Sequence, residues 1–409
     1  MHPICRATGT MKRYFANPHM NSLGRLLTSR KRALGAELVL LGLGSAAALL
    51  MAEVFFRVHD PLGQRLRGNN IVLPISKRYI VEQQQASKLE HVIVHTRNSL
   101  GFRGEDPPRD FDQHLTVVAV GGSSTECMYL SDGKDWPAIV ARGLKSSFPS
   151  LWMNNAGLNG HSTFGHLVLL RQHLLALRPK VIVLMAGIND IARDDLSAYD
   201  MMQLGPQSTM EVLAQYSAVA SATLNSWRAW KASRAGLLHS QIDLRSWPGQ
   251  NAERRRDAMG LLNHHRRNFL PGYQQRVQLL TRLCREANIT LVLVTQPTLY
   301  GPGIDDETGI DLGRIAVSPD EAVNGALAWE ILELYNDVMR EVGKQESVFV
   351  IDLARLLPKS SRLFYDFMHF TPQGSERVAQ IVTPPLCAYL GQSFSEYLMH
   401  PCPVSTSPQ

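Results

Sequence analysis

An acid and a base three residues apart lie near the C-terminal end of the chain, Asp366 and His369. Thr371 and Pro372, which follow, are typical of a helix N-cap and first turn, so we expect the pair on a loop that a helix holds in place. An imidazole can activate a serine hydroxyl when a carboxylate fixes its tautomer. The spacing is compatible with that chemistry, but for an isolated pair local capping by Asp366 beside a packed His369 is the favoured interpretation.

The serine that such a pair could activate is Ser123. It follows the apolar run 115–120 and the turn glycines Gly121 and Gly122. Three interpretations are open: a nucleophile on a sharp turn, a phosphate-binding turn at a helix N-terminus, and plain capping. The third is favoured locally, because Ser123-x-x-Glu126 has the pattern of a capping box. Ser124 is a second candidate nucleophile.

Acyl transfer also needs hydrogen-bond donors where the negative charge develops. Three donors are available: the backbone N–H of Ser123, the backbone N–H of Gly160, and the side-chain amide of Asn189. Gly160 alone would be an ordinary turn residue, and Asn189 with Asp190 an ordinary helix cap. All of these residues, however, follow predicted strands, which favours one shared site.

The elements that must position these residues alternate between strand and helix. The strands are uninterrupted apolar runs, as expected when both faces of a parallel sheet are covered. They are predicted at 115–120, 151–154, 181–185, 290–295 and 348–351, and the helices at 136–144, 163–176, 274–287, 319–343 and 372–390. This order predicts a three-layer α/β/α sandwich around a central parallel, flavodoxin-like sheet, with its chemistry at the carboxyl ends of the strands.

The N-terminal region predicts a membrane anchor. Residues 33–57 are almost entirely apolar and follow the basic cluster Arg30-Lys31-Arg32. The positive-inside rule places residues 1–32 in the cytoplasm and everything after the anchor in the periplasm or outside the cell. A buried core helix is the alternative. Because much of the net charge of +6 lies in this leading segment, we expect no nucleic-acid partner.

The remaining chain divides into three further parts. Residues 58–113 are interpreted as a stalk and lead-in, and residues 114–392 as one domain with a helical insertion at about 195–272. The insertion is basic and contains tryptophan, so a role in binding substrate or a membrane surface competes with an ordinary solvated basic face. Residues 393–409 are interpreted as a flexible tail.

Neither a metal nor a cofactor is expected. The five cysteines lack metal-binding spacing, and the acidic loop at 305–307 fits no calcium-binding pattern. Cys387 and Cys402 could pair in an oxidising compartment, a question that the sequence leaves open.

Four short segments resemble the blocks of the SGNH/GDSL hydrolase superfamily, and the resemblance covers roughly residues 98–390. The blocks are Gly121-Gly122-Ser123-Ser124-Thr125, Asn155-Ala156-Gly157-Leu158-Asn159-Gly160, Gly187-Ile188-Asn189-Asp190 and Asp366-Phe367-Met368-His369. The chain looks like the membrane-anchored, extracytoplasmic branch, which has a lead-in of the Asn98-Ser99-Leu100-Gly101-Phe102-Arg103-Gly104 kind.

The resemblance implies a role for each site residue. Ser123 would be the nucleophile, His369 the base and Asp366 the group that orients it. The N–H groups of Ser123 and Gly160 and the Asn189 amide would form the oxyanion hole. One position departs from the pattern, because Gly122 stands where the family usually has Asp.

These features together predict a membrane-anchored serine esterase that removes an acyl group, such as O-acetyl, from a carbohydrate or envelope glycan. The expected partners are this acylated carbohydrate or a small ester, and a membrane through the N-terminal helix. Two alternatives remain: a polysaccharide O-acetyltransferase that uses the same residues, and a non-catalytic scaffold that binds glycan or phosphate.

Overall fold

The structure is a computed structural model that describes residues 18–58, 66–67, 70–83, 88–194, 209–234, 241–318 and 323–402. It divides into two units, Met1–Pro61 and Leu62–Gln409. In the first unit, α1 (Pro18–Val58) is the described element. Residues 1–17 of the predicted cytoplasmic segment lie outside the described residues.

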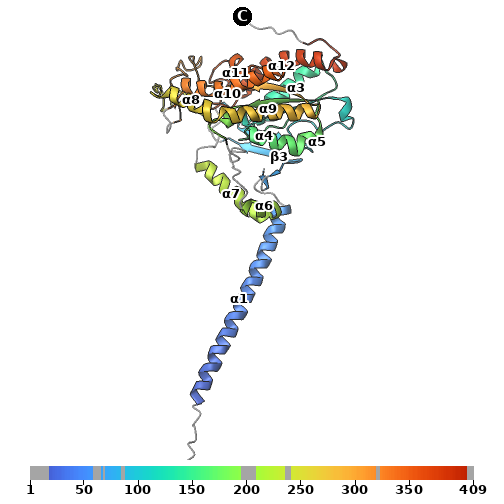
Figure 1. Ribbon diagram of the computed structural model, residues 1–409. Helices are drawn as coiled ribbons and strands as arrows, with labels where there is room; N and C mark the ends of the chain where they lie inside the picture. Colours follow the sequence, from blue (N-terminus) through green and yellow to red (C-terminus); the bar gives the residue numbers. More distant parts are fainter. Residues whose placement is uncertain are drawn as a thin grey trace, which may run out of the picture. The chain divides into compact units, whose positions relative to one another are not determined.

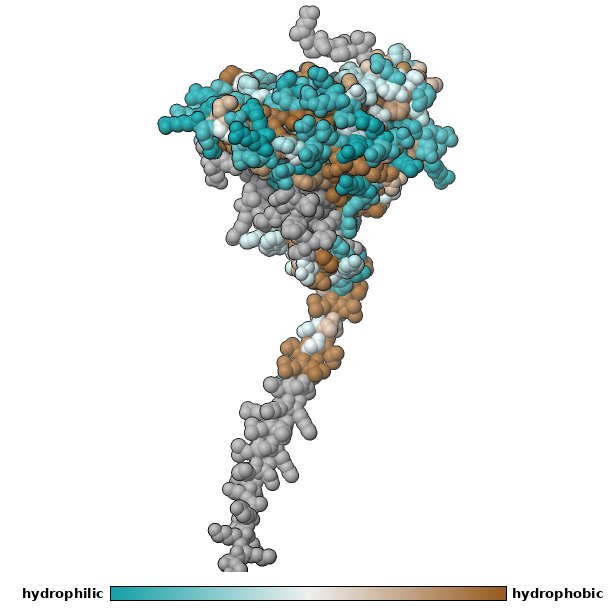
Figure 2. Space-filling view, viewed as in Figure 1, coloured by the Kyte–Doolittle hydropathy of each residue, from teal (hydrophilic) through white to brown (hydrophobic). Residues whose placement is uncertain are grey.

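Helix α1 contains the predicted anchor. The 22 residues Glu37–Val58 have a mean hydropathy of 2.1, so the stretch is long and apolar enough to cross a membrane. Its described side chains are mostly hydrophobic in Figure 2. Leu40, Leu41 and Leu50 are each about two-thirds exposed, which excludes a buried core helix for this stretch.

The second unit is built on a five-stranded parallel sheet in the order β11-β8-β7-β5-β6. Its strands are β5 (Leu115–Gly121), β6 (Leu151–Asn155), β7 (Val181–Ala186), β8 (Thr290–Thr295) and β11 (Phe349–Ile351). Counted along the chain, this is the order 2-1-3-4-5 of a flavodoxin-like sheet. Every residue of β5, β6 and β7 is buried, which explains why these runs lack polar alternation. The predicted fold class is confirmed.

Helices cover both faces of this sheet (Figure 1). On one side, α3 (Trp136–Lys145) contacts α12 (Pro372–Ser393). On the other, α9 (Leu270–Glu286) contacts both α4 (Thr163–Leu169) and α10 (Gly325–Gln345). Each helix turns an apolar stripe inward; α3, for example, buries Trp136, Val140 and Leu144.

Shorter elements complete the described part of the unit. They are β1 (Leu66–Arg67), β2 (Asn70–Ile71), the antiparallel pair β3 (Arg78–Glu82) and β4 (Val92–Thr96), η1 (Phe111–Gln113), α2 (Ser123–Glu126), the π-helical turn Leu170–Leu174, α5 (Leu175–Leu177), η3 (Ile188–Asp190), α6 (Thr209–Tyr216), α7 (Ala218–Arg234), α8 (Ala258–Asn268), β9 (Ala316–Ser318), β10 (Val323–Asn324), α11 (Leu353–Leu356) and η5 (Ser395–Tyr397).

The insertion predicted at 195–272 lies partly outside the described residues, at 195–208 and 235–240. Within its described part, α6, α7 and α8 are helical, whereas residues 241–257 are not. The helix predicted from residue 319 begins only at Gly325, because the Asn324 side chain caps it by accepting the N–H of Leu327 at 3.0 Å.

Part of the segment interpreted as a flexible tail is bonded to the rest of the second unit. Cys402 forms a disulfide with Cys387 of α12. The backbone N–H groups of Met399 and His400 also donate to the Ser147 carbonyl. The rest of the predicted tail, 403–409, lies outside the described residues.

Candidate active site

Ser123 lies where β5 gives way to α2. Gly122 is the N-cap of this short helix and Ser123 is its first residue. A Cβ on Gly121 would lie 2.1 Å from Thr125 Oγ1, so the chain can fold back this tightly only with glycine there. The capping box predicted from Ser123 and Glu126 is wrong, because the N-cap makes no side-chain hydrogen bond and Glu126 instead accepts from Arg97.

Asp366 and His369 lie on a tight loop whose ends pair with each other. Phe364 and Phe370 form an antiparallel bridge, and Asp366 Oδ1 accepts the N–H groups of Met368 and His369 at 2.9 and 2.8 Å. The next helix begins as predicted, with Thr371 as a side-chain N-cap. Short-range contacts therefore fix the orientation of Asp366.

The loop and the Ser123 turn meet. His369 Nε2 lies 2.7 Å from Ser123 Oγ, and His369 Nδ1 lies 2.6 Å from Asp366 Oδ2. All three residues are buried. The hydroxyl of Ser124, by contrast, donates to the Met368 carbonyl at 3.3 Å and accepts from Gln296 Nε2. Ser123, rather than Ser124, is thus the serine in a hydrogen-bonded chain with the histidine and the acid.

The charge on Asp366 is stabilised within this chain. Burial would raise its pKa, but His369 and the two backbone N–H donors outweigh burial and hold the pKa below its usual range. The ring of Tyr365 stacks on His369 at a centroid distance of 5.5 Å. Burial raises the pKa of Tyr365 well above its ordinary value, so its phenol stays neutral. A charged carboxylate therefore lies within hydrogen-bond distance of the His369 ring.

The Asn189 amide lies next to the serine turn. Its Nδ2 donates to the carbonyl of His161 at 3.0 Å, and His161 directly follows Gly160, which has a φ of +75° that suits glycine. Gly122 lies against both groups: a Cβ on it would be 2.5 Å from Asn189 Nδ2 and 3.2 Å from the His161 carbonyl. Glycine at this position, where the sequence departs from the family, makes room for the Asn189 amide.

Two backbone donors remain open here. Among the described residues, the N–H groups of Ser123 and Gly160 have no hydrogen-bond acceptor. Buried backbone donors are normally paired, so an open pair beside a hydroxyl is an arrangement suited to a ligand oxygen. The structure thus brings together all five residues singled out in the sequence.

Two residues of this region, Arg103 and Gln296, were not predicted from the sequence to belong to the site. Arg103 donates from Nη1 to the carbonyls of Glu126 and Cys127, at 2.8 and 2.7 Å, and so holds the end of α2. The only signal was its place in the lead-in segment. Gln296, which directly follows β8, contacts Ser124, and only its position after a strand pointed to it.

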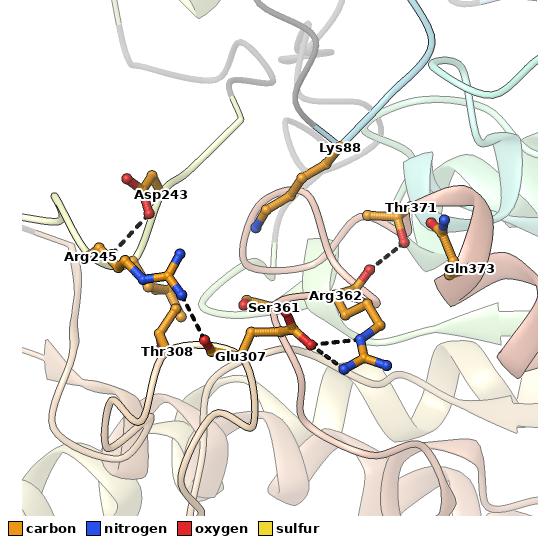
Figure 3. Close-up of a pocket in the computed structure, with 10 residues that line it drawn as sticks. Lys88, Asp243, Arg245, Glu307, Thr308, Ser361, Arg362, Thr371 and Gln373 are labelled. Atoms are coloured by element: carbon orange, nitrogen blue, oxygen red, sulfur yellow. Dashed lines mark hydrogen bonds and ion pairs between the residues drawn. The ribbon is translucent and has the colours of Figure 1, made fainter.

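A polar pocket of about 290 Å³ lies beside the His369 loop (Figure 3). Its lining includes Lys88, Asp243, Arg245, Glu307, Ser361 and Thr371. Lys88 Nζ donates to the Phe364 carbonyl at 3.3 Å, two residues before Asp366. Burial lowers the pKa of Lys88, although nearby carboxylates oppose the shift. Donors and acceptors are therefore both available next to the loop.

Within the described residues, no cluster of three or more His, Cys, Asp or Glu side chains could hold a metal ion. The geometry described above uses side chains and backbone groups alone. What it can supply is a hydroxyl next to a base, with donors beside it.

Comparisons with solved structures found distant similarities. The acetylxylan esterase Axe2 from Geobacillus stearothermophilus is 12% identical, and the match covers 70% of this chain and 96% of that one with a TM-score of 0.38. LAE5, an alpha/beta hydrolase enzyme from the metagenome of Lake Arreo, Spain, is 14% identical, with 66% and 93% coverage and a TM-score of 0.37.

No curated protein matches the chain. The sequence model of the GDSL-like lipase/acylhydrolase family, in contrast, matches residues 119–377, which include Ser123, Gly160, Asn189, Asp366 and His369. Because this match spans more than half of the sequence, the chain belongs to the GDSL-like lipase/acylhydrolase family and is an ester hydrolase of the SGNH type.

Proposed function

We propose that this chain is a serine esterase that works through an acyl-enzyme on Ser123. The observation that carries the proposal is the hydrogen-bonded chain from Ser123 Oγ through His369 to Asp366. Ser123 attacks the ester carbonyl while His369 takes its proton, and Asp366 holds the imidazole in the required tautomer. His369 then protonates the leaving alcohol, and water cleaves the acyl-enzyme in the same way.

The oxyanion of each tetrahedral intermediate is held by three donors: the N–H groups of Ser123 and Gly160 and the Asn189 amide. The two open backbone N–H groups support this assignment. So does the close packing of Asn189 against Gly122. Such preorganised donors contribute a large share of the rate enhancement in acyl transfer.

The substrate we propose is an O-acetylated carbohydrate or envelope glycan. The pocket beside the His369 loop, whose lining does not include the five proposed site residues, offers both donors and acceptors. This suits a polyhydroxylated ligand that extends from the site, because each sugar hydroxyl both donates and accepts.

We also propose that α1 anchors the protein in a membrane, with the N-terminus in the cytoplasm and the catalytic unit in the periplasm or outside the cell. The apolar stretch Glu37–Val58 supports the anchor. The disulfide between Cys387 and Cys402 supports an oxidising compartment for the second unit.

The test is covalent labelling of the full-length protein in detergent with a fluorophosphonate probe. Wild type and Ser124→Ala should label and should release p-nitrophenol from p-nitrophenyl acetate, whereas Ser123→Ala should do neither. Equal labelling or equal turnover by Ser123→Ala would disprove the proposed nucleophile. Release of acetate from an acetylated oligosaccharide, again lost in Ser123→Ala, tests the substrate class.

A further inference from the structure

A buried set of hydrogen bonds joins the turn that carries Gly160 to the turn that carries Asn189. Asp190 accepts hydrogen bonds from the backbone N–H of Thr163 at 3.0 Å and from its hydroxyl at 2.5 Å. Asn189, in turn, donates to the His161 carbonyl. Two adjacent residues of one turn thus bind the other turn at two points, so neither turn can shift alone.

Arg276, which belongs to α9, fixes this junction from a third element. Its Nε donates to Thr163 Oγ1 at 2.8 Å, and its guanidinium lies 3.7 Å from Asp190 and 3.9 Å from the centroid of the Phe164 ring. The Thr163 hydroxyl therefore donates to Asp190 and accepts from Arg276, which leaves it one orientation. Asp190, Thr163 and Arg276 are all buried; we call these three residues the clamp.

The clamp is not the arrangement that stability alone would favour. A neutral Asn or Ser could accept the Thr163 N–H without burying a charge. Burial raises the pKa of Asp190 to about 6, although Thr163 and Arg276 counteract the shift. The ionised form is thus costly here, and what the charged pair adds is a fixed geometry.

We propose that Asp190, Thr163 and Arg276 are positioning residues that hold the Gly160 N–H and the Asn189 amide where they stabilise the oxyanion. This inference rests on the proposed esterase mechanism and extends it. Oxyanion donors act at 2.7–3.1 Å from the developing charge, and a misplacement of about 1 Å can cost about 100-fold in rate. The clamp acts on the transition state and not on the substrate, so its loss should lower kcat and leave KM nearly unchanged.

The test compares two matched threonine variants in the full-length protein with p-nitrophenyl acetate. Thr163→Val removes only the hydroxyl that links Asp190 and Arg276, and we expect kcat to fall about 10- to 100-fold with KM changing less than about twofold. Thr163→Ser keeps the hydroxyl and should restore most of the rate.

Thr116→Val is the control. Thr116 is also fully buried, and its hydroxyl accepts the Lys180 N–H at 2.9 Å, but it lies at the start of β5, at the opposite end of the sheet from the site. This variant should lose thermal stability like Thr163→Val while keeping its kcat. A normal kcat in folded Thr163→Val would overturn the proposal.

A double-mutant cycle separates positioning from a general structural role. If the clamp acts through Asn189, then Asp190→Asn should lower kcat by a clearly smaller factor in an Asn189→Ala background than in wild type. An equal factor in both backgrounds would overturn the part of the proposal that concerns Asn189.

Should the buried variants not fold, Asp194→Ala tests the same unit from its partly exposed side, where Arg276 Nη1 donates to Asp194 at 3.0 Å. We expect a loss of about threefold in kcat there, and an unchanged kcat would count against the clamp. Ser123→Ala belongs in every series. Full activity of that variant refutes the proposed function itself, whereas an inactive Ser123→Ala beside a normal Thr163→Val refutes only the clamp.

Discussion

The two halves of the candidate site are built in different ways. Asp366 of the His369 loop is oriented by contacts within three residues, because it accepts the N–H groups of Met368 and His369. Distant residues also hold the backbone of this loop, since Ser124 and Lys88 donate to two of its carbonyls. The oxyanion turns are held by residues far apart in the chain, since Arg276 reaches Thr163 across 113 positions. The pairing of Asp366 with His369 thus depends mainly on local contacts, whereas the proposed oxyanion hole depends on the packing of elements that are far apart in the sequence.

The two buried carboxylates, Asp366 and Asp190, also differ in how their charge affects stability. Hydrogen bonds and His369 outweigh the burial of Asp366 and hold its pKa below the ordinary value, so its ionised form stabilises the fold. Burial dominates for Asp190 and raises its pKa to about 6, so its ionised form destabilises the fold. The ionised Asp366 therefore stabilises the folded protein, whereas the ionised Asp190 lowers its stability.

The largest effect on kcat is expected for a change in the His369 loop. Asp366→Asn leaves the shape of the loop but presents the wrong hydrogen-bond pattern to His369, so kcat should fall by about 10⁴. Steady-state kinetics with p-nitrophenyl acetate measure the loss, and circular dichroism should show an unchanged fold. A loss below tenfold would mean that Asp366 does not orient the base.

A smaller loss of kcat is expected for a change beside the turns that carry Gly160 and Asn189. In Gly122→Ala, the new methyl group would meet Asn189 Nδ2 at 2.5 Å and displace the amide, so kcat should fall about 100- to 1000-fold, as for loss of one oxyanion donor. Gly260→Ala in α8 is the control, since no atom lies closer than 3.9 Å to its new methyl group. Equal activity of both variants would contradict the packing role of Gly122.

The pH dependence of stability tests the contrast between the carboxylates. Because the pKa of Asp190 is about 6 when folded and 3.8 ordinarily, the folded chain binds this proton more tightly. Stability should therefore fall as pH rises from about 4 to 6, by at most about 3 kcal/mol. Compared with Asp190→Asn, wild type should lose relative stability between pH 4.5 and 6.5.

Denaturant unfolding of the two proteins at both pH values measures this difference. The buried His95 and His166, whose pKa values burial lowers to about 4 and about 3, oppose the trend but are common to both proteins. A stability difference that is constant with pH would show that Asp190 is not destabilised by its charge.

The smallest effect on activity is expected for the Cys387–Cys402 disulfide, which belongs to neither the His369 loop nor the turns that carry Gly160 and Asn189. Reducing the Cys387–Cys402 disulfide opens a loop with a sequence separation of 15, so the protein should lose about 3 kcal/mol of stability. Turnover of p-nitrophenyl acetate at 25 °C should stay within about twofold of the oxidised protein. A large loss of activity would mean that α12, which starts just after His369, transmits the change to the loop.

The contrast also explains what the sequence could predict. The sheet was predictable because its strands are unbroken apolar runs, and Asp366 and His369 because their spacing is short. The partner of Glu126 was not, since the same glutamate could serve a capping box or an ion pair with Arg97. The three clamp residues could not be predicted either, because nothing near Arg276 in the sequence indicates a contact with Thr163 or Asp190. The role of Gly122 became visible only through the position of Asn189.

Arg103 indicates where the catalytic unit begins in the sequence. Its guanidinium donates to three carbonyl groups at and just beyond the end of α2, those of Glu126, Cys127 and Leu130, yet it precedes the family match, which starts at residue 119. A truncated protein that began at that boundary would leave these buried carbonyls without their donor. Recombinant versions of the soluble enzyme should therefore keep the segment from Asn98 onward.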